Sequence, residues 1–317
     1  MTGYIVRRLI GAAFVLFLLT IVVFLMVRSM PGDALIVKLG ETGRIPDEQL
    51  EELRDEMGLD QPLVVQYVNW FSGLVQLDFG DSLIHEGRDI LPYILRALPV
   101  TLQLAVYGLA FGLVMGISVG ILSAVYRGTA IDLVARGIAV FGLAAPVFWV
   151  GLVLILYGSL WFGVSVTRSY VSFADDPWVN TQIMIWPALI LGLNLGAQIM
   201  RYTRSSMLEV MKQDYIRTAS AKGLPGRIVL FRHGLRNAFI PVITLVGTQF
   251  AFLLSGSVVL EVLFRLPGLG RLTYEAILTR DYPAIQGAAL LIGTFVVLIN
   301  LLVDLAYGYL DPRVRYG

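Results

Sequence analysis

The sequence has no cysteine and only two histidines among its 317 residues. The missing cysteine excludes disulfides, thiolate metal sites and thiol nucleophiles. None of the three lysines stands between a glycine and a serine or threonine, so the core of a phosphate-binding loop is missing as well. We therefore expect that this chain does not hydrolyse nucleotides by itself.

Charged residues are also scarce. They make up 15% of the chain against 57% hydrophobic residues, and the mean hydropathy is +0.75, a balance typical of a protein embedded in a bilayer. Crossing the hydrocarbon core takes about 20 apolar residues. Runs that are free of Asp, Glu, Lys and Arg occur at Leu9–Val27, Leu98–Tyr126, Gly137–Thr167, Trp178–Met200, Asn237–Leu260 and Tyr282–Val303. The prediction is an all-α, polytopic membrane protein with six transmembrane helices. The third run is longer than one crossing needs and predicts a turn around residues 161–167.

No Asp, Glu, Lys or Arg lies inside these six runs. Carriers that couple transport to protons or ions usually keep such a residue near the midplane of the membrane, so self-powered transport is disfavoured. The two histidines, His85 and His233, are predicted on opposite sides of the membrane. No two-histidine metal site is therefore expected.

The distribution of basic residues predicts that both termini are cytoplasmic. The segment 31–97, placed outside, carries 13 acidic residues against 5 basic ones. A cleaved signal peptide is the competing interpretation of the N-terminus, but the apolar run is long and no small-residue cleavage site follows it. The domains are predicted as an N-terminal transmembrane helix (1–30), an extracytoplasmic helical insertion (31–97) and a five-helix core (98–317) with a cytoplasmic loop at 205–236. A net charge of +1 gives no reason to expect a nucleic-acid partner.

Small residues recur on one face of the second run, as Gly108, Gly112, Gly116 and Gly120. Glycines one helical repeat apart let two helices approach closely in lipid, so they predict helix packing, with a moving pore-lining face as the alternative. Asn194 and Gln198 are four residues apart and face the same way. Together with Thr244 and Gln249 in the fifth run, they predict either interhelical hydrogen bonds or the wall of a hydrated path.

Two short helices are predicted in the segment 31–97. One runs from Pro46 to Met57 and is amphipathic. The second begins at Pro62 and carries Tyr67, Trp70 and Phe71, which would rest on the membrane interface or on neighbouring helices.

The most basic segment, Asp214 to Pro241, follows the fourth run and holds five Lys or Arg residues against one Asp. A helix is predicted over Met207–Ala221, with Gly223 as its stop and Pro225-Gly226 as a turn before a second helix over Ile228–Asn237. Tyr215, Ile216 and Leu224 are left without an obvious core. Exposed apolar residues among cations indicate a docking surface, and a loop lying on anionic lipid headgroups is the alternative.

This basic segment resembles the EAA loop of ABC-importer permeases, in the form found in the dipeptide and oligopeptide subgroup. The similar residues are DYIRTASAKGL at 214–224 and FRHGLRNA at 231–238. Ala219 and Gly223 match the pattern E-A-A-x-x-x-G, whereas Arg217 and Thr218 replace its Glu and first Ala. Further similar blocks are FLMVRSMPGD at 24–33, FRLPGLGRL at 264–272 and RDYP at 280–283, so the resemblance covers nearly the full length.

The resemblance implies the fold of a type I importer permease in a bacterial or archaeal inner membrane. A second, homologous permease would share the pathway, two cytoplasmic ATPase subunits would bind ATP and Mg, and an extracytoplasmic binding protein would deliver the substrate. This chain would be a non-catalytic subunit with no cofactor of its own. The residues expected to couple it to the ATPase are Tyr215, Ile216, Arg217, Thr218, Ala219, Lys222, Gly223, Leu224 and Arg232.

The implied substrates are dipeptides and oligopeptides, with nickel chelates, glutathione or oligosaccharides as alternatives. A membrane-embedded lipid-processing enzyme would belong to another class, but the chain offers it no cysteine, no histidine pair and no Asp-rich motif. A scaffold without a transport role is the third hypothesis. Co-purification of an ATPase subunit would separate these hypotheses.

Overall fold

The computed structural model describes residues 2–30, 60–84, 87–162 and 168–310, and within these ranges it contains helices but no strand. The structure does not describe some side chains in the fifth apolar run and near the end of the helix that holds the sixth run. Contacts divide the chain into two compact units. The first comprises Met1–Thr101 and Pro267–Gly317, and the second comprises Leu102–Leu266.

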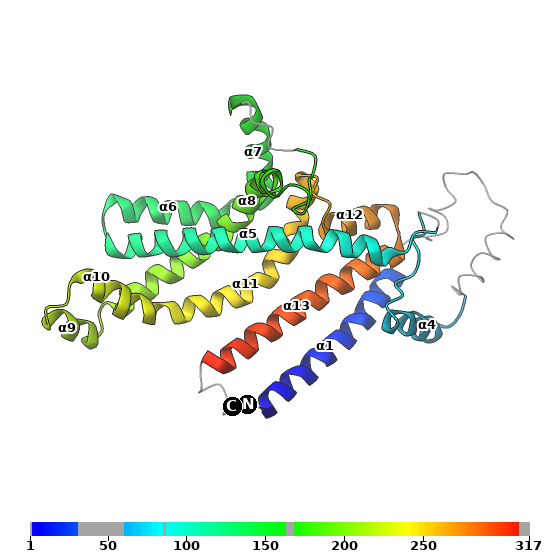
Figure 1. Cartoon of the computed structure of the whole chain (residues 1–317), viewed down its shortest axis with the longest axis horizontal. Coiled ribbons are helices and arrows are strands. Elements are labelled where there is room, and N and C mark those ends of the chain that lie inside the picture. Colours follow the sequence, from blue (N-terminus) through cyan, green and yellow to red (C-terminus); the bar gives the residue numbers. More distant parts are fainter. Residues whose placement is uncertain (1, 31–59, 85–86, 163–167, 311–317) are drawn as a thin grey trace. The chain divides into compact units, whose positions relative to one another are not determined.

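The described residues of the apolar runs lie almost entirely on helices (Figure 1). In chain order the helices are α1 (Thr2–Arg28), α4 (Leu63–Val75), α5 (Ile90–Val125), α6 (Ala130–Ala144), α7 (Val147–Phe162), α8 (Pro177–Val210), α9 (Asp214–Ala221), α10 (Gly226–Ile228), the π-helix η1 (Val229–Leu235), α11 (Arg236–Leu263), α12 (Leu269–Thr279) and α13 (Tyr282–Leu310). Among the described residues, four helices are long and apolar enough to cross a membrane, namely α1, α5, α8 and α13. The 28-residue helix α11 covers the fifth run. An all-helical membrane fold is thus confirmed, and its helices are compatible with six spans.

The third apolar run differs from a single straight span. Its described residues lie mainly on α6 and α7, which are bent by 104° at the break between them, as in a broken span or a re-entrant loop. The break follows from Pro146, because the residue before a proline is disfavoured in the helical region. Ala145 accordingly adopts an extended conformation with φ −74° and ψ 122°. The turn predicted at residues 161–167 falls largely outside the described residues.

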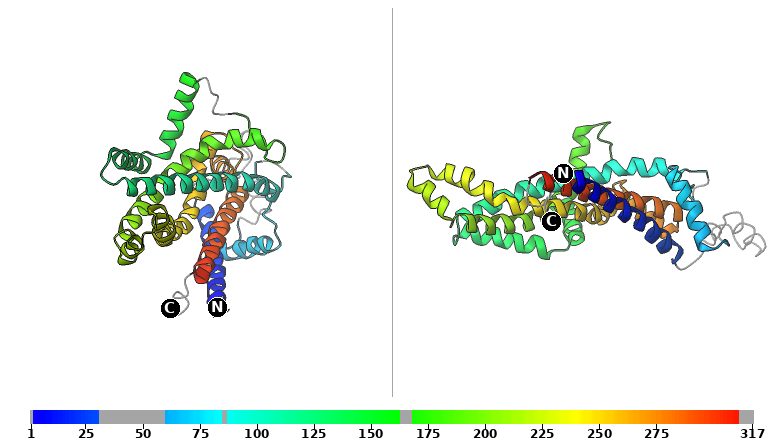
Figure 2. Two further views of the ribbon diagram at one scale, coloured as in Figure 1. Left: turned by 60° about the vertical axis from the view of Figure 1, so that its left-hand side comes forward. Right: turned by 90° about the horizontal axis from the view of Figure 1, so that it is seen from below.

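In the first unit, α1 and α13 run antiparallel, side by side (Figures 1 and 2). Gly293 of α13 lies directly against the side chain of Leu19, so the two helices approach closely there. A cluster of buried side chains joins α1, the start of α5, α12 and α13, and includes Val27, Ile94, Leu269 and Ile285. This apolar cluster is the core of the unit.

Helix α4 packs on α1 through aromatic rings. Phe24 of α1 lies 5.4 Å from Tyr67 and 5.6 Å from Trp70, measured between ring centroids. The hydroxyls of Thr20 and Tyr67 are hydrogen-bonded at 2.8 Å. The helix begins after Pro62 as predicted, and of the two predicted environments for its aromatic residues the structure shows a neighbouring helix. The amphipathic helix predicted over 46–57 lies outside the described residues.

In the second unit, α8 is the central helix, because α6, α7 and α11 all contact it. It begins with a well-formed cap: the Asp176 carboxylate accepts hydrogen bonds from the backbone N–H groups of Trp178 and Val179, both at 3.0 Å. Pro177 occupies the first helical position, where no N–H is needed. The cytoplasmic loop predicted from the sequence follows the other end of this helix.

Candidate functional site

The basic segment after α8 forms a short separate helix, α9. Helix α8 ends at Val210, and Gln213 has an extended backbone with ψ 149° before α9 starts at Asp214. The continuous helix predicted over 207–221 is therefore wrong. An acidic residue in a first helical turn interacts favourably with the helix dipole, so Asp214 favours a new N-terminus over the continuation of α8.

The end of α9 has the predicted glycine stop. Gly223 has a φ of +76°, in the left-handed region that favours glycine. A Cβ at this position would meet nothing within 4 Å, so the cost of a side chain would be conformational rather than steric. Pro225 then precedes α10, and the chain returns to the apolar part through the π-helix η1. Single π-helical turns are frequent at functional sites.

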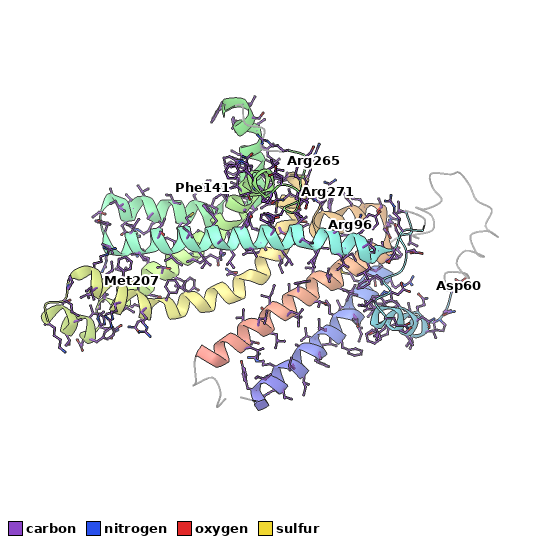
Figure 3. The ribbon with its side chains drawn as sticks, in the orientation of Figure 1. Asp60, Arg96, Phe141, Met207, Arg265 and Arg271 are labelled. Carbon is purple, nitrogen blue, oxygen red and sulfur yellow. The ribbon has the colours of Figure 1, made fainter. Side chains whose placement is uncertain are left out.

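One face of α9 packs inward. Ile216 is 3% exposed and Ala219 is 7% exposed, and both contact Val229 of η1 in a small apolar core. The expectation that Ile216 has no core is therefore wrong, because η1 folds back against α9 and covers it. Gly234 of η1 lies close to Met211 and to Met207. Met207 is fully buried near the end of α8 and is labelled in Figure 3.

The other face of α9 and its flanks are exposed. We call this face the α9 surface; its apolar members are Tyr215, Leu224, Ile228 and Phe231, and its cations are Arg217, Lys222, Arg227 and Arg232. Tyr215 and Phe231 are 44% and 49% exposed. Thr218 is exposed as well, and its hydroxyl donates to the carbonyl oxygen of Asp214 at 2.9 Å. The arrangement presents aromatic side chains among positive charges, a composition that suits a protein interface.

The polar residues of the apolar runs form a chain of hydrogen bonds. Gln198 donates to Asn194 at 3.0 Å, and Asn194 donates to the carbonyl oxygen of Gly142 at 3.1 Å. Gln249 of α11 donates to the side-chain oxygen of Gln198. The amides thus connect α6, α8 and α11 while staying partly exposed. The side chain of Thr244 lies outside the described part of α11, and a place on the translocation path stays a prediction for all four residues.

The four glycines of α5 lie against α8. An added Cβ would sit 3.1 Å from the Leu191 side chain at Gly108, and 3.0 Å from the Leu195 side chain at Gly112. At Gly116 it would sit 2.7 Å from a backbone oxygen, and at Gly120 2.9 Å from one. The close approach extends along the whole row of glycines, since a Cβ added to Gly192 of α8 would lie 2.5 Å from the backbone oxygen of Gly108. The predicted packing role is open to test by substitution.

A buried ion pair was not recognised in the sequence. Both guanidinium nitrogens of Arg204 that face Asp132 donate to its carboxylate, at 2.9 and 3.0 Å. The same carboxylate accepts from the Ser123 hydroxyl at 2.6 Å and from the Gly128 backbone at 3.0 Å. The pair joins α8 to the first turn of α6, and the Ser123 bond adds the end of α5. A signal was available, since Asp132 is the only acidic residue between Asp89 and Asp175.

A second buried carboxylate lies in the first unit. Asp281 accepts hydrogen bonds from the Ser82 hydroxyl at 2.5 Å and from the Leu83 backbone at 3.2 Å. It precedes α13 and belongs to the RDYP block that carried the family resemblance. It ties the segment before α5 to the start of α13. In the described ranges of the chain, no three His, Asp or Glu side chains are grouped to hold a metal ion.

These features define a helical membrane subunit with an exposed, partly apolar segment after its central helix. The family described as the binding-protein-dependent transport system inner membrane component matches residues 108–316, and the N-terminal part of such membrane components matches residues 1–105. The chain therefore belongs to this family of inner-membrane transport components. Family membership, predicted from the three sequence blocks, is confirmed.

Relatives match over the full length. A peptide transport system permease protein of Brucella abortus (strain 2308) is 41% identical over 316 residues, covering 100% of both chains. The dipeptide transport system permease protein DppB of Escherichia coli (strain K12) is 39% identical over 343 residues, covering 100% of this chain and 99% of the relative. Among solved structures, the inward-facing MetNI methionine ABC transporter matches with a TM-score of 0.56 at 19% identity, over 69% of this chain and 96% of that chain. The last match supports the fold alone.

Proposed function

We propose that this chain is the permease subunit of an ATP-driven importer, and that it forms a pathway for dipeptides or oligopeptides together with a second, homologous permease. Two cytoplasmic ATPase subunits would supply the energy, and an extracytoplasmic binding protein would deliver the substrate. Both termini would be cytoplasmic. Tyr4 and Arg8 at the start of α1 contact Asp304 near the end of α13, which supports an even number of crossings.

The observation that carries this proposal is the α9 surface. The chain lacks a phosphate-binding loop, so an importer built from it needs a partner that hydrolyses ATP. Helix α9 projects Tyr215 among cations while Ile216, on the adjacent face, holds it to η1. Aromatic residues ringed by polar ones are typical of interface hot spots. We assign this face to the ATPase subunit.

The peptide substrate is supported by the names of the relatives at 41% and 39% identity. Nickel chelates, glutathione and oligosaccharides stay alternatives, because a binding protein contributes to substrate choice. The hydrogen-bonded amides of Asn194, Gln198 and Gln249 are the proposed polar groups of the path. Their donors and acceptors can exchange their mutual bonds for bonds to a peptide backbone, which carries the same kinds of groups.

Binding and transport are tested on the reconstituted complex. Tyr215→Ala should weaken ATPase binding by about 2 kcal/mol, roughly thirtyfold in affinity, if Tyr215 is an interface anchor. Arg227→Gln is the matched charge-only change on the same surface and should have a smaller effect. The measurements are retention of the ATPase subunits and uptake of a labelled dipeptide into vesicles.

The alternative function of this segment predicts the opposite order. A loop lying on anionic headgroups depends on its cations and is nearly indifferent to Tyr215. Normal ATPase retention by Tyr215→Ala, together with loss of function in Arg227→Gln, would therefore refute the docking assignment. ATP hydrolysis by the isolated chain, free of contaminating ATPase, would refute its assignment as a non-catalytic subunit.

A further inference from the structure

A groove of about 780 Å³ opens between α1 and α13, both in the first unit. At one end it is lined by polar side chains, namely Tyr4, Arg7, Arg8, Asn300 and Asp304. Its remaining walls are apolar or small, and include Gly11, Val15 and Leu301. The groove therefore has a polar end and an apolar end, like a phospholipid.

The packing of the two helices explains the opening. Near the other end of the pair, Gly293 and the side chain of Leu19 are in direct contact. At Gly11 an added Cβ would meet nothing within 4 Å. Glycine weakens a helix interior relative to alanine, and close helix packing does not account for it at this position. Gly11 instead widens the groove, because it places no side chain in the groove wall.

The polar end of the groove is positively charged. Arg8 is bound to Asp304 with an N–O distance of 2.8 Å, and the Tyr4 hydroxyl donates to the Asp304 carbonyl oxygen at 3.0 Å. Arg7 is exposed and lines the same end. The lining of this end thus holds two guanidinium groups and one carboxylate, which leaves one positive charge in excess. Basic pockets between transmembrane helices suit anionic lipid headgroups.

We propose that this groove is a binding site for an anionic phospholipid. The phosphate lies beside Arg7, within reach of the hydrogen-bond donors at the polar end. An acyl chain follows the groove past Gly11 toward Val15 and Leu301. The groove shares no residue with the polar groups proposed above for the transport pathway.

The test is native mass spectrometry of the purified complex taken from vesicles of equal parts phosphatidylglycerol and phosphatidylcholine. Arg7→Gln should lower the retained phosphatidylglycerol about fivefold, the effect expected of one basic residue near an anionic lipid surface, and leave phosphatidylcholine unchanged. Asp304→Asn should raise phosphatidylglycerol retention, because it removes the carboxylate that competes for Arg8. Gly11→Leu should lower the retention of both lipids by filling the apolar part.

The control is Arg127→Gln, which removes an exposed arginine that does not line the groove. It should leave lipid retention unchanged. Since Arg7 and Gly11 are both exposed, their replacement should not prevent assembly, and the same spectra report the intact complex. Equal phosphatidylglycerol retention by wild type, Arg7→Gln and Gly11→Leu would overturn the proposal and leave a helix of a partner subunit as the occupant.

Discussion

Replacing Gly116 by alanine should strongly destabilise the second unit. The added Cβ would lie 2.6 Å from the Cβ of Ile199 and 2.7 Å from the backbone oxygen of Gly196, both on α8. Contacts under 3.0 Å are essentially never seen for real Cβ atoms, and a backbone oxygen cannot rotate away. Helices α5 and α8 would therefore have to separate. Overpacking of this kind costs about 1–3 kcal/mol, and the upper end applies because separation also weakens the neighbouring glycine contacts.

Two matched glycine-to-alanine substitutions serve as controls for the change in the free energy of unfolding. Gly137→Ala on α6 adds the same methyl group where nothing lies within 4 Å, so it should be neutral or stabilise by up to about 1 kcal/mol through helix propensity. At Gly108 the three atoms nearest to an added Cβ all belong to the side chain of Leu191, at 3.1 to 3.3 Å, and this side chain can shift. The expected order of stability is Gly137→Ala first, Gly108→Ala next and Gly116→Ala last.

Unfolding by SDS in mixed micelles, followed by tryptophan fluorescence, gives the free energies. The chain has five tryptophans to report the transition. If Gly116→Ala unfolds at the same SDS fraction as Gly137→Ala, the close approach of α5 and α8 is not formed in the membrane. The packing role of the four glycines would then be wrong, and their alternative as a moving pore-lining face would be favoured.

Three further experiments probe the side of the protein that we propose to be cytoplasmic. Gly223→Ala should weaken ATPase binding about tenfold, because the left-handed conformation costs a non-glycine residue about 1–2 kcal/mol. Gly226 has no positive φ, so Gly226→Ala should bind the ATPase like wild type. Equal ATPase retention by the two variants would contradict a conformational role for Gly223. Arg204→Met should lower the SDS unfolding midpoint more than Asp132→Asn. It removes both guanidinium hydrogen bonds from a carboxylate that is 2% exposed and leaves it with the more distant Arg136, at 3.5 Å, whereas Arg204 is 22% exposed and reaches water. The reverse order would count against this pair. Since the chain has no cysteine, Arg227→Cys should react with an impermeant thiol reagent only in opened cells, and labelling in intact cells would disprove the proposed topology.

The sequence predicted the helices well because charge-free runs in a bilayer leave few alternatives to a helix. The pattern of charge-free runs did not predict the break at Pro146, where proline divides one apolar run into α6 and α7. The existence and glycine stop of the α9 helix were also predictable, since Gly223 is a local signal. Its start at Asp214 was missed. Helix formers stand on both sides of Gln213 and predict one continuous helix, although the acidic residue in the first turn of α9 was a signal for a new start.

Long-range partners were the least predictable part of the candidate site. Asn194 and Gln198 are four residues apart, so their shared face follows from helix geometry. Their link to Gln249 depends on how α8 and α11 pack. The pairing of Asp132 with Arg204, 72 residues apart, depends on how α6 and α8 pack. A sequence pattern shows that such buried groups need partners. Which partner is found depends on the tertiary arrangement.

The joints around α9 lead to a last prediction. Helices α5, α6 and α8 are held together by close glycine contacts and by the Asp132 ion pair, whereas α9 is joined to α8 through the non-helical residues 211–213 and to α11 through a π-helix. A force on α9 can reach the spans only if α9 does not turn at these joints. Ile216, 3% exposed against Val229, opposes that turning.

Ile216→Ala should therefore uncouple hydrolysis from transport. Truncating a buried isoleucine to alanine costs about 2–5 kcal/mol, and here the loss falls on the contact between α9 and η1, while Tyr215 on the outer face is unchanged. ATPase subunits should still bind and hydrolyse ATP, but dipeptide uptake per ATP should fall. Tyr215→Ala should instead reduce binding and leave uptake per ATP of the assembled complexes near the wild-type value. If Ile216→Ala lowers ATPase retention as much as Tyr215→Ala and keeps the wild-type uptake per ATP, the buried face of α9 serves docking and not the transmission of force.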